Sequence, residues 1–511
     1  MKLKTRLLPF ESAYFTVILD QRLAKKLDVK LSDRVVVRYD GRSLTAIVNI
    51  AKDFPEDSIG IYTNLARVLG VSEGDEVEIE ATNPPISLQV IRKKLQGLKL
   101  EPDEVHLLVK DIVEGKVNEL ELAALVTAFH FQGMSPSEIY DFTVSMVGTG
   151  QRLNLKKRPI LDKHSLGGVP GDKTSLLVVP IIASFGYTIP KTSSRAITSA
   201  AGTADRMEVL APVNFSIEEI EKIVERTNAC IVWGGSLNLA PADDIIIRVE
   251  YPLGIDPFFI PSILAKKLAV GSTHIVLDIP TGKGTKVKTL GEARRISQDF
   301  LEISRMLNMN LQTVATYAEE PIGHAIGPAL EAREALQALR TLNPPDLVDK
   351  AASLAGVLLE MVGVQDGYEL AMESLRSGKA ERKLREIIEA QGGDPNIRPD
   401  DLPIGDKTYT IYAGESGFVY HIDNSLLANM GKIAGAPVDK GAGVYVHVKL
   451  GEKVKKGDPL ITVYSSSSSK LQLIEKLTEE TAPVLIGRTA GRKMLLERIQ
   501  YQPARLTTLE R

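Results

Sequence analysis

The sequence predicts a multidomain α/β protein built from four consecutive parts. These are an N-terminal β-barrel (1–84), a helical domain (85–158, joined by part of the central region), a large central α/β domain (159–405) and a C-terminal α+β domain (406–511). The first observation is length, because 511 residues exceed a typical domain of roughly 150 residues several times over. The second is an internal repeat near the N-terminus. The third is the order of the later patterns: helical, then alternating strand and helix, then mainly strand.

The N-terminal part contains two related halves. The shared positions, 42 residues apart, are Leu27, Val29, Asp33, Val35 and Val37, which recur as Leu69, Val71, Asp75, Val77 and Ile79. Each half predicts a strand, a short helix, a tight turn and a second strand that alternates apolar and polar residues. Two such halves can bury their apolar faces only against each other, so we expect a closed barrel. The pattern resembles a double-psi β-barrel.

A helical segment follows the turn at Asn83-Pro84-Pro85 and extends over roughly 87–149. Apolar residues in DEVHLLVKDIVEGK and NELELAALVTAF recur at spacings of three and four, which predicts helices with one buried face. Ser135 to Glu138 has the spacing of a capping box, with proline at the first helical position.

The central part alternates short strands, such as 229–233 and 273–279, with helices such as 328–340. From about residue 408 the pattern returns to strands. There the GEKVKKGDPL element resembles part of a biotinyl/lipoyl-type hammerhead without a carrier lysine, so we interpret it as structural. The serine run 465–469 predicts a flexible connection.

Composition excludes several classes of function. The formal net charge of -3 gives no general attraction to nucleic acid or to an anionic membrane. The most apolar stretch, Leu176 to Ala183, is broken by Pro180 and is far shorter than the ~20 residues of a membrane span. With one cysteine, Cys230, no intramolecular disulfide can form, and no signal peptide is visible. We therefore expect a cytoplasmic protein.

A glycine-rich segment from Asp162 to Ser175 precedes a predicted helix. Glycine lets backbone N–H groups turn toward an anion, and the start of a helix adds unpaired donors. Lys163 adds a positive charge, and Ser165 and Ser175 add hydroxyl donors. The segment predicts an anion site. The alternative is a strand-to-helix turn whose glycines serve geometry alone.

A second polar segment follows at 193–205. It places five hydroxyl groups and Arg195 within eleven residues, a composition suited to phosphate and ribose oxygens. The alternative is a polar loop that satisfies its own hydrogen bonds.

Together these segments resemble the thymidine/pyrimidine-nucleoside phosphorylase family. The family signature S-[GS]-R-[GA]-aliphatic-x-x-[TA]-[GA]-G-T-x-D-x-x-E is nearly complete from Ser193 to Glu208. Further matches lie at 239–243, 262–268 and 323–331, so the resemblance extends over roughly 87–490. It implies a pentosyltransferase in which inorganic phosphate attacks an N-glycosidic bond, a homodimer formed through the helical domain, and a site between the helical and α/β domains.

Two differences from the thymidine phosphorylases indicate which branch of the family this chain resembles most. Thymidine phosphorylases lack the N-terminal barrel and carry a Gly-His-Thr-like stretch where this chain has Ile197 to Ala200. The chain also has Asp256 just before a predicted helix. The pattern most resembles the archaeal AMP phosphorylases. The implied reaction converts AMP, with CMP and UMP as further candidates, and phosphate to the free base and ribose 1,5-bisphosphate.

The resemblance also implies roles for single residues. The attacking phosphate would be held by Lys163, Ser165, Ser175, Ser193 and Thr203, with backbone donors near Gly167 and Gly168. The residues implied to contact the nucleotide are Gly168, Ser194, Arg195, Ala196, Ile197, Thr198, Ser199, Thr203, Ser262 and Lys286. Either Arg195 or Lys286 would bind the 5′-phosphate. Asp256 would protonate the purine N7, and the alternative role of Asp256 is a helix cap.

Other residues keep alternatives open. His164 would either face the base or support the loop, and His324 is expected to be structural. Arg248 and Lys266 match pyrimidine-binding residues, so a pyrimidine nucleoside phosphorylase is the first alternative. A phosphoribosyltransferase of the anthranilate type and a non-enzymatic scaffold are the others. We expect no metal and no organic cofactor, and as partners only a nucleoside 5′-monophosphate, phosphate and further copies of the chain, without nucleic acid or membrane.

Overall fold

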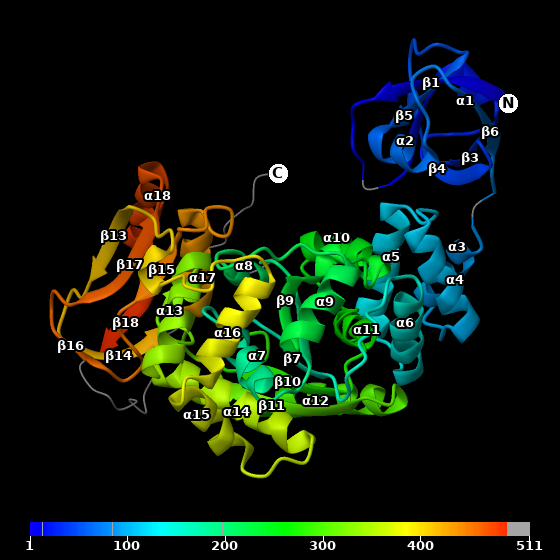
Figure 1. Ribbon diagram of the computed structural model, residues 1–511. Helices are drawn as coiled ribbons and strands as arrows, with labels where there is room; N and C mark the ends of the chain where they lie inside the picture. The colour runs from blue at the N-terminus through cyan, green and yellow to red at the C-terminus, as the bar shows by residue number, and fades with distance from the viewer. Residues whose placement is uncertain (13, 84, 197–198, 488–511) are drawn as a thin grey trace, which may run out of the picture.

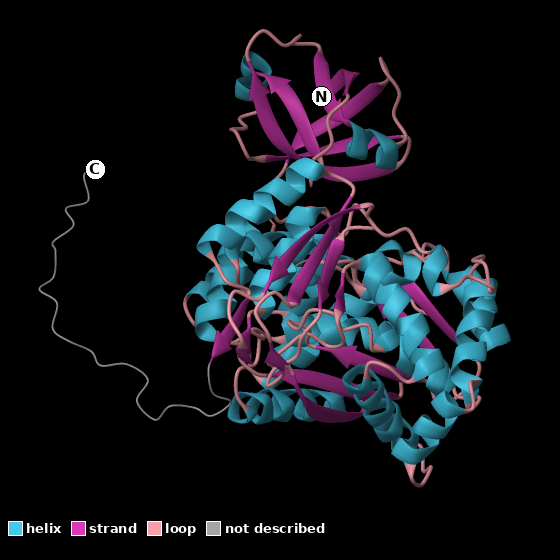
Figure 2. Cartoon of the chain, turned by 90° about the vertical axis from the view of Figure 1, so that its left-hand side faces the viewer, coloured by secondary structure: helices cyan, strands magenta, loops and turns pink. Residues whose placement is uncertain are grey.

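The computed structural model describes residues 1–12, 14–83, 85–196 and 199–487. The N-terminal barrel stands at one end of the molecule, above the helical domain, and the C-terminal domain lies at the opposite end (Figure 1). The central α/β domain lies between them. Figure 2 shows the barrel from a second direction, again seated on the helices below it. Within the described residues, no helix is long and apolar enough to cross a membrane.

The N-terminal part is a closed barrel with strand order β1-β5-β2-β4-β3-β6, which confirms the predicted barrel. Its elements are β1 (Lys2–Leu8), β2 (Thr16–Asp20), α1 (Gln21–Lys26), β3 (Arg34–Tyr39), β4 (Arg42–Ala51), β5 (Ser58–Tyr62), α2 (Thr63–Leu69) and β6 (Glu76–Ala81). The starts of β2, α1 and β3 recur 42 residues later as those of β5, α2 and β6. The repeat therefore builds two matching halves, whose alternating apolar residues are buried in one core.

A buried arginine attaches the barrel to the helical domain. Arg34 in β3 donates from Nε to the carbonyl oxygen of Lys116 over 2.7 Å, and it pairs with the carboxylate of Glu121. Glu121 also accepts the N–H of Asn118 over 2.8 Å as part of a capping box. The barrel is thus attached at the first turn of a helix.

The helical domain contains α3 (Ser87–Leu95), α4 (Pro102–Val113), α5 (Glu119–Gln132) and α6 (Pro136–Gly148). The predicted capping box at Ser135 is present, since its N–H donates to Glu138 over 2.9 Å. Two later helices, α10 (Pro241–Leu253) and α11 (Phe259–Val270), pack into the same core. Phe258 lies between them, and its ring is 5.1 Å from those of both Phe129 and Phe142. The helical unit therefore includes part of the central sequence.

The α/β domain is organised around parallel strands flanked by helices. Its other elements are β7 (Leu161–Ser165), α7 (Ser175–Ser184), β8 (Ile189–Ser193), α8 (Thr203–Glu208), α9 (Ile217–Thr227), β9 (Ala229–Trp233), η1 (Gly234–Ser236), β10 (His274–Thr281), α12 (Leu290–Met306), β11 (Asn310–Tyr317), β12 (Ala325–Ile326), α13 (Pro328–Thr341), α14 (Pro345–Met361), α15 (Gly367–Arg376), α16 (Lys379–Ala390) and η2 (Pro399–Asp401). One group of strands has the order β11-β10-β7, and β8 pairs with β9. A single parallel bridge from Ile160 to Thr188 joins the two groups.

The C-terminal domain contains two small antiparallel sheets and two helices. Its elements are β13 (Lys407–Tyr412), β14 (Gly417–Ile422), α17 (Asn424–Ala434), β15 (Gly443–Val446), β16 (Lys453–Val454), β17 (Pro459–Ser465), α18 (Ser468–Glu480) and β18 (Val484–Gly487). The predicted flexible serine run is wrong, because Ser465 ends β17 and Ser468 begins α18. The buried hydroxyl of Ser465 donates to the carbonyl oxygen of Ala434 over 2.6 Å, which fixes the start of the run.

Candidate active site

The carboxyl ends of the parallel strands create a crevice at the centre of the α/β domain. Strand β7 continues through α7 to β8 on one side, whereas its other neighbour, β10, continues through α12 to β11 on the opposite side. In open α/β sheets, ligands bind where neighbouring crossovers diverge in this way. The loops at this position are 166–174 and 282–289. The first of them is the predicted anion loop.

The two loops are in direct contact. Gly167 and Gly168 have positive φ angles of 74° and 89°, which side chains rarely adopt. A Cβ atom at Gly168 would lie 2.9 Å from the backbone nitrogen of Lys286 and 3.1 Å from its Cγ. Glycine is therefore required here by both conformation and space. The fold brings together two residues, Gly168 and Lys286, that were predicted to contact one nucleotide.

Lys163 lies beneath this loop in a buried group of charges. Its ammonium nitrogen is 3.6 Å from Asp172 and 3.9 Å from Asp278, distances longer than a direct hydrogen bond. Lys350 approaches Asp278 to 2.9 Å. Burial opposes ionisation of Asp172, but the charges of Lys163 and Lys350 outweigh it and hold its pKa well below the usual range. Because neither carboxylate is within direct hydrogen-bond distance, the Lys163 ammonium group retains donors for an anion.

The predicted phosphate-binding hydroxyl groups surround the same edge of the sheet. Ser165 is the last residue of β7, and its hydroxyl oxygen accepts the N–H of Gly167 over 3.3 Å. Ser193 is the last residue of β8, and Ser175 is the first residue of α7. The amino-terminal turn of α7 adds N–H donors and the positive end of a helix dipole.

The signature segment, residues 193–208, is held in place by hydrogen bonds to its own acidic residues. Asp205 accepts the N–H groups of Ala196 over 2.7 Å and Gly202 over 2.9 Å. Arg195 donates to both oxygens of Glu208, over 2.7 and 2.5 Å, and its guanidinium stacks on Trp233. These contacts explain the acidic positions of the signature as loop supports.

The same hydrogen bonds occupy the Arg195 side chain with carboxylates of the protein itself. The Arg195 hydrogen bond lowers the pKa of Glu208 to about 2, and Lys440 of the C-terminal domain adds to the effect. Lys440 lies 2.5 Å from Glu208. Because its terminal nitrogens are engaged by carboxylates, Arg195 has few donors left for a 5′-phosphate, which favours Lys286.

The remaining predicted residues of this segment are partly described. Ser194 accepts the N–H of Ala204 through its carbonyl oxygen over 3.4 Å, and the hydroxyl of Ser199 donates to the carbonyl oxygen of Ala201 over 2.9 Å. Thr203 is the first residue of α8, and its hydroxyl oxygen accepts a hydrogen bond of 3.4 Å from Arg206. The Thr203 hydroxyl proton thus stays available to an anion. The predicted residues Ile197 and Thr198 lie outside the described residues.

Asp256 lies in the exposed turn that connects α10 and α11. Loss of hydration within the surrounding protein raises the pKa of Asp256 above its usual value. The charge of Asp243 adds to this rise, and the charges of Lys286 and Lys266 oppose it. The charge of Lys286 therefore acts on Asp256 while its backbone contacts Gly168. Lys286 therefore links the anion loop to the turn that carries the predicted acid.

Helix α11 carries two further residues considered in the sequence analysis, Ser262 and Lys266. Ser262 and Lys266 are one helical turn apart, so they share a face of the helix. Lys266 is 2.6 Å from the buried carboxylate of Asp243. Arg248, on α10, is exposed. This pairing fixes the position of the Lys266 ammonium group, whose charge lowers the pKa of Asp256.

His164 is surrounded by ammonium groups. Burial, together with the charges of Lys267, Lys191 and Lys163, holds the pKa of His164 well below its usual value. Lys267 is 2.7 Å from Asp162, which lies on the same face of β7 as His164 because side chains alternate along a strand. The imidazole is neutral near pH 7, so it can accept or donate one hydrogen bond.

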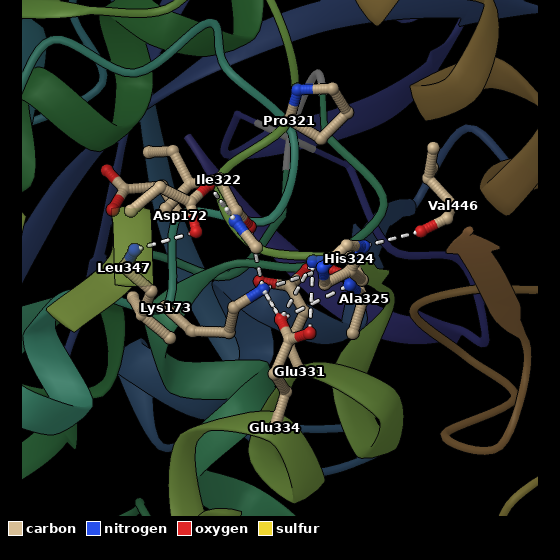
Figure 3. Close-up of polar contacts among 12 residues, drawn as sticks. Asp172, Lys173, Pro321, Ile322, His324, Ala325, Glu331, Glu334, Leu347 and Val446 are labelled. Atoms are coloured by element: carbon tan, nitrogen blue, oxygen red, sulfur yellow. Dashed lines mark hydrogen bonds and ion pairs between the residues drawn. The ribbon is translucent and has the colours of Figure 1, made fainter. Parts of the chain in front are cut away.

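The loop after β11 ties the anion loop to the C-terminal domain (Figure 3). Lys173 donates to the carbonyl oxygens of Ile322 over 2.9 Å and Ala325 over 3.0 Å, and it pairs with the carboxylate of Glu334. Glu334 accepts the N–H of His324 over 2.9 Å, and the Nδ1 atom of His324 is 2.7 Å from the carbonyl oxygen of Val446. In this position, His324 supports the loop.

Comparison with known proteins agrees with this organisation. A model described as "Glycosyl transferase family, helical bundle domain" matches residues 88–150, and "Glycosyl transferase family, a/b domain" matches 157–381. "Pyrimidine nucleoside phosphorylase C-terminal domain" matches 418–484. The AMP phosphorylase of Thermofilum pendens is 78% identical over 511 residues, which cover 100% of both chains. That of Thermococcus kodakarensis is 47% identical over 505 residues, covering 98% of this chain and 99% of its own.

The chain belongs to the AMP phosphorylase family. AMP phosphorylase 1 of Archaeoglobus fulgidus is 46% identical, over 94% of this chain and 96% of its own. Among solved structures, anthranilate phosphoribosyltransferase from Thermus thermophilus has a TM-score of 0.49 and 21% identity, and the match covers 59% of this chain and 98% of that chain.

Several residues that shape the site of this family member were missed by sequence reasoning. Lys191 donates to the carbonyl oxygen of Lys163 over 2.7 Å, and Lys350 pairs with Asp278. Glu250 is buried next to the Asp256 turn. The only signal in the sequence was a charged residue at an otherwise apolar position, which does not reveal its partner. Within the described residues, no group of three His, Cys, Asp or Glu side chains is arranged to hold a metal.

Proposed function

We propose that this protein catalyses the phosphorolysis of AMP to adenine and ribose 1,5-bisphosphate, with inorganic phosphate as co-substrate. The observation that carries the proposal is the meeting of Gly168 with Lys286 at the diverging strands, with the charge of Lys286 acting on Asp256. Full-length relatives named AMP phosphorylase support this reaction over that of a pyrimidine nucleoside phosphorylase. CMP and UMP are further candidate substrates.

In the proposed reaction, phosphate occupies the loop around Gly167 and Gly168. Lys163 and the hydroxyl groups of Ser165, Ser175 and Ser193 donate to its oxygens, and Thr203 adds a donor from the signature segment. One phosphate oxygen attacks the ribose C1′ atom as the bond from C1′ to the base nitrogen breaks. Holding both reactants in line accounts for a large part of the rate in such reactions.

The departing purine needs a proton, because its anion is a poor leaving group. Asp256 donates that proton to N7, and the bonding electron pair leaves with the base. General acid catalysis of this kind typically contributes about 10²–10⁴-fold. The raised pKa of Asp256 supports the role, since a carboxyl group must keep its proton to donate it.

Lys286 is the proposed ligand of the nucleotide 5′-phosphate. The alternative, Arg195, is bound to Glu208 and Asp205 through its terminal nitrogens. A full positive charge beside a dianion gives selectivity for nucleotides over nucleosides. Ser262 and the 194–199 segment complete the proposed nucleotide contacts.

We also propose that two copies associate through the helical domain. Helix α5 is apolar on more than its buried face, and Leu120 and Phe131 are 81% and 78% exposed. Residues eleven apart lie on one face of a helix, so these side chains form part of an outward apolar stripe. Light scattering after size exclusion should give a dimer or larger assembly, and Phe131→Glu should reduce the mass. An unchanged mass would place the interface elsewhere.

The substrate proposal is tested by phosphate-dependent base release from AMP, CMP, UMP, adenosine and thymidine, measured side by side. Release from the monophosphates but not from the nucleosides is the expected result. Release from thymidine alone would return the chain to the pyrimidine nucleoside class, with Arg248 and Lys266 as its base-binding residues.

A further inference from the structure

Lys350 is a buried lysine of α14 that the proposed mechanism does not use. The residue is 8% exposed, and its ammonium nitrogen is shielded from solvent. This nitrogen lies 2.9 Å from the Oδ2 atom of Asp278, in an ion pair without the alignment of a hydrogen bond. A charge in the protein interior is costly unless an opposite charge is close, so Lys350 and Asp278 depend on each other.

Asp278 lies at the proposed phosphate site. It pairs with Ser165 in the register of β10 and β7, and Lys163 shares a face of β7 with Ser165 because side chains alternate along a strand. The Oδ1 atom of Asp278 accepts the hydroxyl of Thr316 over 2.6 Å. The ion pair of Lys350 and Asp278 is thus directly beside two predicted phosphate ligands.

Lys163 is close to two carboxylates that already have other partners. Its ammonium nitrogen is 3.9 Å from Asp278, which is held by Lys350. It is 3.6 Å from Asp172, whose Oδ1 atom accepts the hydroxyl of Thr174 over 2.5 Å. Because the attraction between opposite charges grows as they approach, a carboxylate without its partner would draw the Lys163 ammonium group toward itself. The two lysines and the two aspartates therefore form one four-charge network.

The charges of this four-charge network balance one another. Burial opposes the charge of Lys350, but the carboxylates of Asp172 and Asp278 outweigh it and raise the pKa of Lys350 above its usual value. Two ammonium groups thus face two carboxylates before phosphate enters. The charge of Arg206 also acts on Asp172, but Arg206 is paired with Glu331 and adds no excess. Without Lys350 the network would become negative, which disfavours a phosphate dianion.

We propose that Lys350 is a positioning residue for the co-substrate: by holding Asp278, it keeps the Lys163 ammonium group free to bind inorganic phosphate. The proposal rests on the proposed function, in which Lys163 holds the attacking phosphate. Because the Lys350 nitrogen is shielded from solvent, it acts through Lys163 rather than on phosphate itself. Loss of Lys350 therefore weakens phosphate binding and leaves the chemical step nearly unchanged.

Three variants separate this role from general support of the fold. Lys350→Met keeps a long apolar side chain but leaves Asp278 buried without its cation. Lys350→Met combined with Asp278→Asn removes both charges, and the amide oxygen can still accept the Thr316 hydroxyl. Asp278→Asn alone leaves a surplus positive charge. The matched control is Lys94→Met, which breaks another buried ion pair of 2.9 Å, with Glu138 in the helical domain.

The first experiment measures initial rates at varied phosphate and saturating AMP. Lys350→Met should raise the KM for phosphate by about 10–100-fold, as expected for loss of a charge-assisted hydrogen bond, with little change in kcat. The double variant should return the KM most of the way to the wild-type value, and Asp278→Asn alone should not raise it. Lys94→Met should have the wild-type KM. An unchanged KM in Lys350→Met, or a raised KM that Asp278→Asn does not reverse, would overturn the proposal.

Phosphate binding without nucleotide makes the test independent of turnover. In equilibrium dialysis with ³²P-labelled inorganic phosphate, wild type and the double variant should bind more tightly than Lys350→Met. Should Lys350→Met fail to fold, the double variant decides: affinity near that of wild type is expected, and loss of binding would overturn the proposal. Absence of AMP phosphorolysis by wild type, with this order of phosphate affinities intact, would overturn the proposed function alone.

Discussion

Asp172 and Glu250 are carboxyl groups of the candidate site, the first partly buried and the second buried, and their pKa values are shifted in opposite directions. Asp172 lies within the anion loop, 3.6 Å from the ammonium nitrogen of Lys163, and its pKa is held well below the usual range. Glu250 accepts the N–H of Phe258 next to the Asp256 turn, and burial, followed by the charge of Asp256, raises its pKa to about 8. Burial acts in the same direction on both groups, so the difference comes from their neighbours. The loop side, residues 166–174, thus favours binding of an anion. The turn side, between α10 and α11, favours carboxyl groups that keep a proton.

The largest effect is expected from the loop side. Lys163→Ala removes the buried cation that faces Asp172 and Asp278, so the site loses its attraction for phosphate and gains uncompensated negative charge. We expect kcat/KM for phosphate to fall by about 10²–10³-fold or more. Initial rates at varied phosphate concentration give this value. A fall of less than tenfold would show that the anion is held mainly by backbone groups.

On the turn side, Asp256→Asn should lower kcat by about 10²–10⁴-fold while the KM for phosphate stays nearly constant. The reason is that the amide cannot donate a proton to the base with comparable ease. Rates with saturating AMP measure the effect. Near-normal turnover would reduce Asp256 to a cap of the following helix.

Lys286 connects the two sides, and its substitution should separate nucleotide from nucleoside. Lys286→Ala should weaken kcat/KM for AMP by about 10–100-fold, as expected for a lost charge-assisted hydrogen bond, and leave any adenosine activity unchanged. The control is Lys283→Ala in the same loop, where Lys283 lines a surface hollow with Lys288 and Ser425. Equal losses for AMP and adenosine would remove Lys286 from the 5′-phosphate.

The smallest effect is expected at the Arg195–Glu208 ion pair of the signature segment. Hydrogen bonding to Arg195 lowers the pKa of Glu208 to about 2, so its stabilising contribution is present above pH 5 and is lost as the pH falls toward 2. Glu208→Gln should lower the melting temperature by about 2 °C at pH 7, and the difference should shrink by pH 3. Calorimetry at the two pH values checks this. A difference that persists at pH 3 would mean that packing, rather than charge, holds the segment.

The barrel and the anion loop could be predicted because their signals are local. The barrel repeat places Val35 and Val77 at equivalent positions, and the loop glycines adopt positive φ angles just after a strand. The serine run failed as a prediction because a buried bond from Ser465 to Ala434 outweighs its composition.

The buried charge network could not be predicted, because its partners are far apart in the sequence. Lys350 reaches Asp278 across 72 positions, and Lys173 reaches Glu334 across 161. Glu250 lies in an ordinary amphipathic helix, and only the packing of Phe258 against α5 and α6 shows that its carboxyl group is buried. Residue types therefore indicate a phosphate site, whereas the charge state of each group depends on the assembled fold.

The most direct test of a site with an anion side and a proton side is to follow wild-type protein with AMP and phosphate by ³¹P NMR while adenine is quantified. One phosphate should be consumed for each adenine released, and a product with two phosphorus signals, ribose 1,5-bisphosphate, should appear in equal amount. Adenine release without phosphate consumption would identify a hydrolase and contradict the account.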